Sequence, residues 1–188
     1  YYVYGILHDP EYREEFAADL KKMLPHIPTP ETRDQFDAYA TAGKRLAGLH
    51  VEYEQVTPYP VSIQVKEGAD PENQETWRVK KMRWAKKKDP DTNKNVDDKT
   101  SIIVNPFVTI SDIPEDADRY MLGSRSALGW LLDRYQVKTD KPSGITNDPN
   151  DWADEHDNPR YIAELIAKVV TVAAETMRIV SELRSEPR

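Results

Sequence analysis

The sequence of 188 residues contains no cysteine. This absence excludes disulfide bonds, thiolate catalysis and cysteine-ligated zinc, and it fits a reducing compartment, for which we expect the cytoplasm. No apolar run approaches the roughly 20 residues that a membrane-spanning helix needs, and no signal peptide opens the chain. The chain also begins with Tyr1 instead of an initiating methionine, so we interpret it as a piece of a longer polypeptide.

The composition is that of a folded protein. Hydrophobic residues make up 38% of the chain and charged residues 31%, with 4 tryptophans and 10 tyrosines, which excludes a disordered tail. The length suits one domain with a sizeable core. The net charge of -7 argues against a nucleic-acid partner when it is taken as an average over the whole sequence.

The charge is distributed unevenly, however. Residues 76–88, TWRVKKMRWAKKK, carry seven basic side chains and no acidic one, so this window is +7 and the remainder of the chain is -14. Trp77 and Trp84 lie within it, so contacts to phosphates and to bases or sugars are both available. A solvated edge strand whose lysines block aggregation is the alternative, and charge alone leaves both interpretations open.

The hydrophobic spacing predicts helices in the first 50 residues. Asp9-Pro10 is typical of a helix start, and apolar residues at helical spacing predict that this helix continues to Pro25. A second helix is expected from about residue 31 to residue 50, with Gly43 at a close helix crossing. We interpret residues 1–50 as a helical segment that links to an upstream domain.

From residue 51 the period changes to that of strands. Residues 61–66 alternate between apolar and polar, and the β-rich runs 75–84 and 100–110 predict a hairpin with a long polar loop. The apolar residues change from one face of the predicted strand to the other near Lys80-Lys81, which predicts a bulge that directs basic side chains off the sheet.

Two further helices are predicted near the C-terminus. The first starts at Ser124 or Ser126 and carries two apolar stripes, which indicates a central helix buried on both flanks. The second follows the cap sequence Asp157-Asn158-Pro159 and is long. The fold class is therefore α+β, with helices at both ends of a small, mostly antiparallel sheet. We expect residues 51–188 to form one domain, or the whole chain 1–188 a single unit.

Several stretches partly match short catalytic or metal-binding motifs, but each lacks residues that the motif requires. The loop Asp89-x-Asp91-x-Asn93 starts like a calcium loop but lacks the required glycine and the final glutamate. The acidic residues between 148 and 157 are explained as turn and cap chemistry. Neither Asp97-x-Lys99 nor Asn105-Pro106-Phe107 has the partners that a nuclease or a methyltransferase needs. The sequence therefore predicts no catalytic residue and no metal site.

Several stretches resemble one known family. The first 28 residues are similar to the segment that follows the catalytic domain in large restriction-modification methyltransferases. The stretches NPFVTISDIP (105–114), SRSALGWLLDRYQVKTDKPSGITNDPNDW (124–152) and the helix start PRYI (159–162) resemble the C-terminal specificity domain of type ISP restriction enzymes. The resemblance runs over nearly the whole chain and is weakest in residues 51–73.

In that family a single polypeptide carries a nuclease, an ATP-driven translocase, an adenine methyltransferase and a target-recognition region. The resemblance implies that this chain recognises sequence in double-stranded DNA and has no catalytic activity of its own. It implies two partners, duplex DNA and the methyltransferase domain of the same polypeptide, and no membrane. ATP, magnesium and S-adenosylmethionine would be used elsewhere in the full enzyme, with no cofactor in this chain.

The basic residues then become the candidate DNA contacts. Arginines suit guanine edges because their planar fork matches two acceptors, whereas lysines suit phosphates. The predicted DNA-binding residues are Arg78, Lys80, Lys81, Arg83, Lys86, Lys87, Lys88, Arg125, Lys138 and Lys141. Alternatively, the basic window contacts an acidic surface of the same enzyme, or the chain is a non-catalytic docking module whose helices hold neighbouring domains.

Overall fold

The computed structural model describes residues 1–22 and 24–185, which form two compact units. The first unit contains residues 1–56 together with the described residues from 174 onward, and the second contains residues 57–173. The boundary near residue 56 lies close to the boundary expected at residue 50. The sequence does not show that the end of the last helix packs with the first unit.

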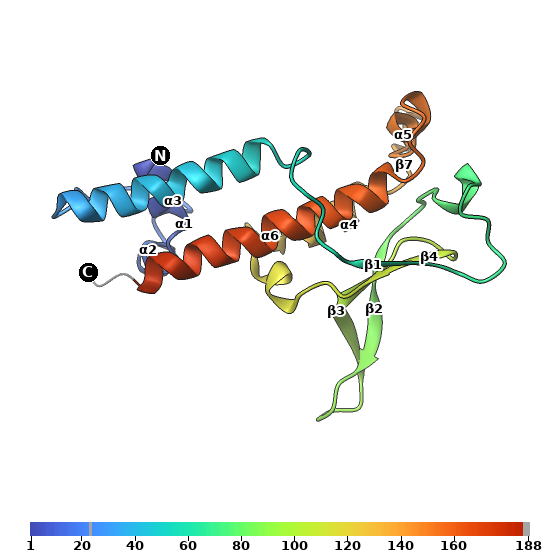
Figure 1. Ribbon diagram of the computed structural model, residues 1–188, viewed down its shortest axis with the longest axis horizontal. Coiled ribbons are helices and arrows are strands. Elements are labelled where there is room, and N and C mark those ends of the chain that lie inside the picture. Colours follow the sequence, from blue (N-terminus) through green and yellow to red (C-terminus); the bar gives the residue numbers. More distant parts are fainter. Residues whose placement is uncertain (23, 186–188) are drawn as a thin grey trace. The chain divides into compact units, whose positions relative to one another are not determined.

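The first unit is helical. It contains α1 (Tyr2–His8), α2 (Pro10–Glu15) and α3 (Arg33–Val51), and the last part of α6 (Tyr161–Ser185) packs with α3 (Figure 1). Both predicted helix starts are confirmed, because Asp9 accepts a hydrogen bond from Glu11 N and Thr32 accepts one from Gln35 N.

The helix predicted to run from Pro10 to Pro25 is wrong in its length. Helix α2 ends at Glu15, the chain continues in turns to Lys22, and Leu24 is 88% exposed. Tyr12 is buried, and its hydroxyl donates to His26 O at 2.8 Å, which holds the returning chain against α2. This contact between residues 14 positions apart replaces the last turns of the predicted helix.

The predicted close crossing at Gly43 is confirmed. A Cβ atom at Gly43 would lie 2.7 Å from Gly5 N and closer still to Tyr1 O, and one at Gly5 would overlap the main chain of Tyr39. Helices α1 and α3 therefore touch main chain to main chain. Only glycine leaves room for this contact at both positions.

A histidine pair lies within the first unit. His50 Nδ1 is 2.7 Å from the Tyr4 hydroxyl and Nε2 is 2.8 Å from Thr176 Oγ1, while His8 Nδ1 donates to Tyr4 O at 2.8 Å. Burial, with the neighbouring His8, lowers the pKa of His50 to about 4. Burial also lowers the pKa of His8, with a further contribution from Arg13. Both rings are neutral at pH 7 and tie together α1, α3 and α6.

This pair predicts that acid destabilises the first unit. Both histidines have a lower pKa folded than unfolded, so their contribution is complete above about pH 6.5 and is lost as the pH falls toward 4. After allowance for solvent screening, we expect about 1–2 kcal/mol less stability at pH 5 than at pH 7. Urea unfolding at several pH values measures this. His50→Gln should flatten the profile, whereas an unchanged profile in that variant would contradict the prediction. His156→Gln, which alters an exposed histidine of the second unit, is the control.

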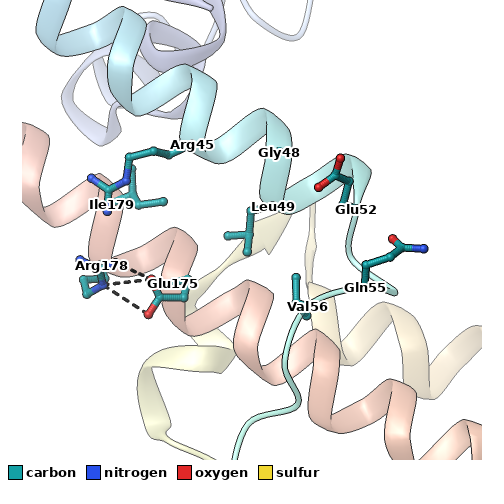
Figure 2. Close-up of a pocket in the computed structure, with 9 residues that line it drawn as sticks. All are labelled: Arg45, Gly48, Leu49, Glu52, Gln55, Val56, Glu175, Arg178 and Ile179. Atoms are coloured by element: carbon teal, nitrogen blue, oxygen red, sulfur yellow. Dashed lines mark hydrogen bonds and ion pairs between the residues drawn. The ribbon is translucent and has the colours of Figure 1, made fainter.

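A groove of about 380 Å³ separates α3 from the end of α6 in the first unit (Figure 2). Leu49, Val56 and Ile179 supply its apolar lining, and Gly48 lies on its α3 side. On its α6 side Arg178 forms ion pairs with Glu175 and with Glu182.

The second unit is built on an antiparallel four-stranded sheet. Its strands are β1 (Ser62–Val65), β2 (Arg83–Lys88), β3 (Asn95–Ile103) and β4 (Val108–Ser111), in the order β1-β4-β3-β2. The predicted strand at 61–66 and the predicted basic hairpin are both confirmed as β1 and β2–β3.

The strand limits around the hairpin differ from the prediction. Residues 75–82 do not form the first arm. The 3₁₀ helix η1 (Gln74–Thr76) ends within this range, residues 77–82 belong to no strand of the sheet, and β2 extends from Arg83 to Lys88. The run 100–110 is divided between β3 and β4 by a turn at residues 104–107. Buried side chains on both sides of residues 77–84 remove the alternation that would have marked the strand limits.

Short elements complete the second unit. They are η2 (Glu115–Arg119), the hairpins β5–β6 (Met121–Leu122, Arg125–Ser126) and β7–β8 (Lys138–Thr139, Thr146–Asn147), α4 (Ala127–Arg134) and α5 (Asp151–Glu155). Ser126 caps α4 as predicted, accepting from Gly129 N at 3.0 Å.

Helix α4 is buried on one flank only, so the prediction of burial on both flanks is wrong. Leu128, Leu131 and Leu132 are buried, whereas Arg134 and Val137 are exposed. The residues of the predicted second stripe lie at the surface, where the Arg134 guanidinium is 4.5 Å from the centre of the Trp130 ring. In the described part of the chain no helix is long and apolar enough to cross a membrane.

Candidate nucleic-acid interface

The outer half of the β2–β3 hairpin is a two-stranded ribbon. Strand β4 pairs with β3 only at Ile102 and Ile103, whereas β2 pairs with β3 from Arg83 to Lys88. The residues beyond Trp84 on β2 therefore have no third strand beside them. This outer ribbon extends from the sheet as the green hairpin in Figure 1.

A bulge separates the outer ribbon from the sheet. Trp84 pairs with Ile102 but Ala85 pairs with Asp98, so β3 contains three extra residues, 99–101. Asp98 fixes the bulge by accepting from both the main-chain nitrogen and the hydroxyl of Thr100, and these bonds lower its pKa. The prediction of a bulge at Lys80-Lys81 is wrong, because these residues precede β2 and the extra residues lie on β3, opposite Trp84 and Ala85.

The lysines of the outer ribbon are partly matched by acidic residues across the hairpin. Lys86 forms a 2.6 Å ion pair with Asp97, Lys87 lies 3.6 Å from Asp98, and Lys88 donates to Asn93 O at 3.2 Å. From residue 83 to residue 103 the hairpin carries six basic and four acidic residues, a net charge of +2. The strong positive charge of the sequence window is thus reduced by the strand that folds against it.

A second group of predicted DNA-binding residues is brought together from two segments that are far apart in the sequence. Val137 N donates to Lys80 O at 2.9 Å, and Lys81 forms an antiparallel bridge with Gln136. This pairing brings the segment before β2 alongside the end of α4 and the start of β7, which carries Lys138. Residues more than 50 positions apart therefore form one basic region.

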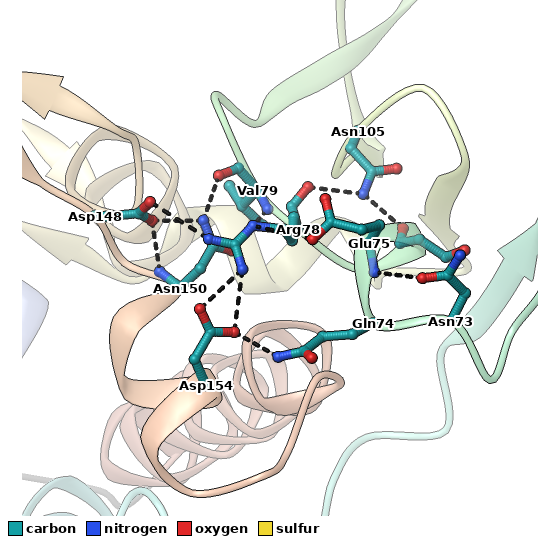
Figure 3. Close-up of polar contacts among 10 residues, drawn as sticks. Asn73, Gln74, Glu75, Arg78, Val79, Asn105, Asp148, Asn150 and Asp154 are labelled. Carbon is teal, nitrogen blue, oxygen red and sulfur yellow. Dashed lines mark hydrogen bonds and ion pairs between the residues drawn. The ribbon is translucent and has the colours of Figure 1, made fainter.

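Arg78 is held by carboxylates of the same chain (Figure 3). Its guanidinium donates twice to Asp154, at 2.8 and 3.1 Å, and lies 3.6 Å from Asp148 and 3.8 Å from Glu75. The hydrogen bond to Asp154 and these charges raise the pKa of Arg78. Asp154 and Asp148, two members of the acidic cluster at 148–157, thus form ion pairs with an arginine. Among the described residues, no group of three or more potential ligands is arranged for a metal ion.

Two buried asparagines fix the main chain of residues 76–79. Asn105 donates to Thr76 O and Arg78 O and accepts from the main-chain nitrogens of residues 107 and 108. Asn150 accepts from Val79 N and donates to Val79 O, both at 2.8 Å (Figure 3). These side chains supply hydrogen bonds that a neighbouring strand would otherwise supply, and so hold these residues in place without a strand of the sheet beside them.

The predicted contacts therefore fall into two classes. Arg78, Lys86, Lys87 and Arg125 have ion pairs, the last with Asp133 at 2.5 Å. In the described part of the chain the others have no acidic partner within ion-pair distance; these are Lys80, Lys81, Arg83, Lys88, Lys138 and Lys141.

Comparison with known proteins places the chain in a family. The family described as the Type ISP C-terminal specificity domain matches residues 1–165. The chain belongs to this family. The specificity domain has no match among curated proteins.

Three solved structures are similar to the specificity domain. One is a nuclease-deletion mutant of the type ISP restriction-modification enzyme LlaGI in complex with a DNA substrate mimic, with 39% identity over 96% of this chain and a TM-score of 0.77. The ATP-dependent type ISP enzyme LlaBIII bound to DNA is 36% identical over the whole chain, with a TM-score of 0.78. A DrdV–DNA complex is 34% identical over the whole chain, with a TM-score of 0.73. The specificity domain spans 13%, 11% and 18% of these chains.

The structure adds residues to the site that the sequence alone did not indicate. Asn105 and Asn150 hold the segment before β2, and Arg134 and Asn147 line a cleft with Lys138 and Lys141. An asparagine directly before Pro106 marks a turn, which was a usable signal for Asn105. The role of Asn150 depends on a contact 71 residues away, so no local pattern of the specificity domain indicates it.

Proposed function

We propose that this chain recognises a target sequence in double-stranded DNA for a larger restriction-modification enzyme. The observation that carries the proposal is the match, at 34% to 39% identity, to three solved structures, each of which is a complex with DNA or a DNA substrate mimic. The outer ribbon and the basic region beside it supply groups that suit such a ligand. Their side chains donate hydrogen bonds of the kind that phosphates and base edges accept.

The outer ribbon has dimensions that suit the major groove. It has four residues on β2 beyond the bulge, about 13 Å at ~3.3 Å per residue, and a turn at its end. The major groove of B-DNA is about 12 Å wide and admits a two-stranded ribbon, and base pairs present different donor and acceptor patterns there. The ribbon can therefore reach base edges while its flanks face phosphates.

The ion pairs suggest which basic residues have a structural role and which contact bases or phosphates. Arg78 is occupied by Asp154 and Asp148, so its main contribution is to hold the segment before β2 in place. Arg83 is exposed without an ion pair in the described chain, which makes it the better arginine for a guanine edge. Lys86 and Lys87 can exchange an exposed carboxylate partner for a phosphate, because such surface pairs contribute only about 0–1 kcal/mol.

The wider assignment follows from the family. The full enzyme would use ATP, magnesium and S-adenosylmethionine in its other domains, and its methyltransferase domain would act on the DNA that this chain positions. We place the enzyme in the cytoplasm, where such DNA is found. Flipping one adenine out of a duplex requires a second contact that holds the helix, which this chain would supply.

Titration of the chain with duplex DNA at several salt concentrations tests the proposal. We expect log K to fall linearly with log salt, because phosphate contacts release bound counterions. Charge reversal of the ribbon in the variant K86E/K87E/K88E should weaken every sequence alike by at least about tenfold and reduce the slope. Arg83→Ala should instead change the preference between sequences.

A matched control separates local contacts from total charge. The variant K21E/K22E/K44E changes the net charge by the same amount with three exposed lysines of the first unit. It should retain most of the affinity. If the wild-type chain binds DNA weakly and without a salt slope, the recognition function is wrong and the docking module becomes the better explanation.

A further inference from the structure

We propose that the cleft between α4 and the β7–β8 hairpin is a second DNA contact, which holds a backbone phosphate independently of the ribbon. This inference rests on the proposed function and names the part of the ligand that the cleft takes. The cleft measures about 620 Å³. Its lining includes three basic side chains, Arg134, Lys138 and Lys141, and the amide of Asn147.

The shape of the cleft is set by the β7–β8 hairpin. Lys138 pairs with Asn147 and Thr139 with Thr146, and the two threonine hydroxyls lie 2.8 Å apart. At the end of the hairpin Gly144 has a φ of 70°, a conformation that favours glycine, and its nitrogen donates to Asp140 O. The hairpin therefore holds Lys138 on a strand and Lys141 in a defined turn.

The acidic groups of the cleft already have partners. Asp133 is paired with Arg125 at 2.5 Å, and the Asp140 carboxylate accepts from Ser143 N at 3.0 Å and from Ser143 Oγ at 2.6 Å. The bonds from Ser143 lower the pKa of Asp140, with a smaller effect of Lys138, so this carboxylate stays charged. Neither carboxylate lies within ion-pair distance of the cleft's own cations.

The basic side chains of the cleft, by contrast, have N–H donors that form no ion pair within the described chain. In the described chain Lys138, Lys141 and the Arg134 guanidinium have no ion pair, and the guanidinium has no hydrogen bond. Arg134 is positioned by Trp130, whose ring centre is 4.5 Å away and whose indole nitrogen donates to Leu122 O. A cation held over an aromatic ring in this way keeps its N–H donors available for an anion.

The position of the cleft links it to the ribbon. Gln136 lines the cleft and is the bridge partner of Lys81, two residues before β2 begins. The cleft and the base of the hairpin are thus joined by main-chain hydrogen bonds within the second unit. A contact of one duplex with both would fix the register of the ribbon in the groove without carrying sequence information itself.

The test is the variant K138E/K141E in the same DNA titration, with two duplexes of unrelated sequence. We expect the Kd to rise about tenfold for both duplexes alike, and the salt slope to fall by roughly 0.9, the value for one phosphate that is no longer neutralised. Arg134→Ala should show a smaller change of the same kind. The control is K21E/K22E, with equal charge change in the first unit.

The outcomes separate the two proposals. If wild type binds DNA but K138E/K141E matches the control in affinity and slope, the cleft does not hold phosphate and the recognition function stands. If the variant changes the preference between the duplexes instead of weakening both, the cleft reads bases and the phosphate assignment is wrong. If wild type does not bind, both proposals fail. Thermal unfolding of each variant checks whether the fold is retained.

Discussion

Replacing Asn105 with alanine should lower the free energy of unfolding by about 3–4 kcal/mol. The side chain is buried and makes four hydrogen bonds to main-chain atoms, two as donor and two as acceptor. Its removal leaves the carbonyl oxygens of Thr76 and Arg78 and the nitrogens of Phe107 and Val108 without these partners. Each buried polar group left unpaired costs about 1–3 kcal/mol, reduced where water can enter.

Thermal or urea unfolding measures this effect. The loss corresponds to a decrease in Tm of about 10 °C for a chain of this size. Asn95→Ala is the matched control, because Asn95 is exposed on the outer ribbon and its side chain has no hydrogen bond in the described structure; we expect a change within about 0.5 kcal/mol. Equal stability of the two variants would show that residues 76–79 do not depend on Asn105.

Gly43→Ala and Gly48→Ala should change stability in opposite directions. Both glycines lie in α3, so each gains the helix propensity of alanine, about 0.5–1 kcal/mol. At Gly48 nothing lies within 4 Å of the added Cβ, which would project beside the groove of Figure 2, and the gain is kept. At Gly43 the methyl group overlaps the main chain of α1, and overpacking of this kind costs about 1–3 kcal/mol or more.

Urea unfolding gives the sign of each change, and limited proteolysis shows where the damage lies. In Gly43→Ala we expect cleavage near α1 to accelerate, because the helix can no longer approach α3. A stable Gly43→Ala variant with unchanged proteolysis would contradict the close crossing. The pair compares one substitution at two positions of the same helix, so differences in helix propensity cancel.

Much of the fold could be predicted from local signals. The caps Asp9 and Ser126, the strand 61–66 and the long last helix follow from short-range chemistry, because each depends on residues within about four positions. The close crossing at Gly43 could also be predicted, since glycine in the middle of an amphipathic helix is costly unless a neighbour needs the space.

Two of the incorrect predictions have the same physical cause, which is a contact with residues far away in the sequence. The helix after Pro10 ends early because Tyr12 bonds to the returning chain, and the segment 75–82 is held by Asn105 and Asn150 instead of by a strand. Apolar spacing reports which side chains are buried but not which element buries them. The buried residues of this segment therefore looked like strand residues.

The candidate site shows the same limit. The basic character of residues 76–88 is evident from the sequence, but the ion pairs of Arg78 with Asp154 and of Lys86 with Asp97 form only in the fold. Charge counts within a window do not include the opposite strand. The grouping of Lys80 and Lys81 with Lys138 likewise depends on main-chain pairing that has no local signal.

The bulge in β3 has a consequence for how recognition could diversify. Because residues 99–101 are fixed by Asp98, Thr100 and a bond from Ile113 N, the sheet is complete without the outer ribbon. Two residues added to each strand beyond the bulge would lengthen the ribbon by about 7 Å and keep every side chain on its original face, whereas a single added residue would invert the faces. We therefore expect that the outer ribbon of one related enzyme can replace that of another when the chains are joined at the bulge. The transferred ribbon should keep its own length, and the sheet of the recipient should stay intact.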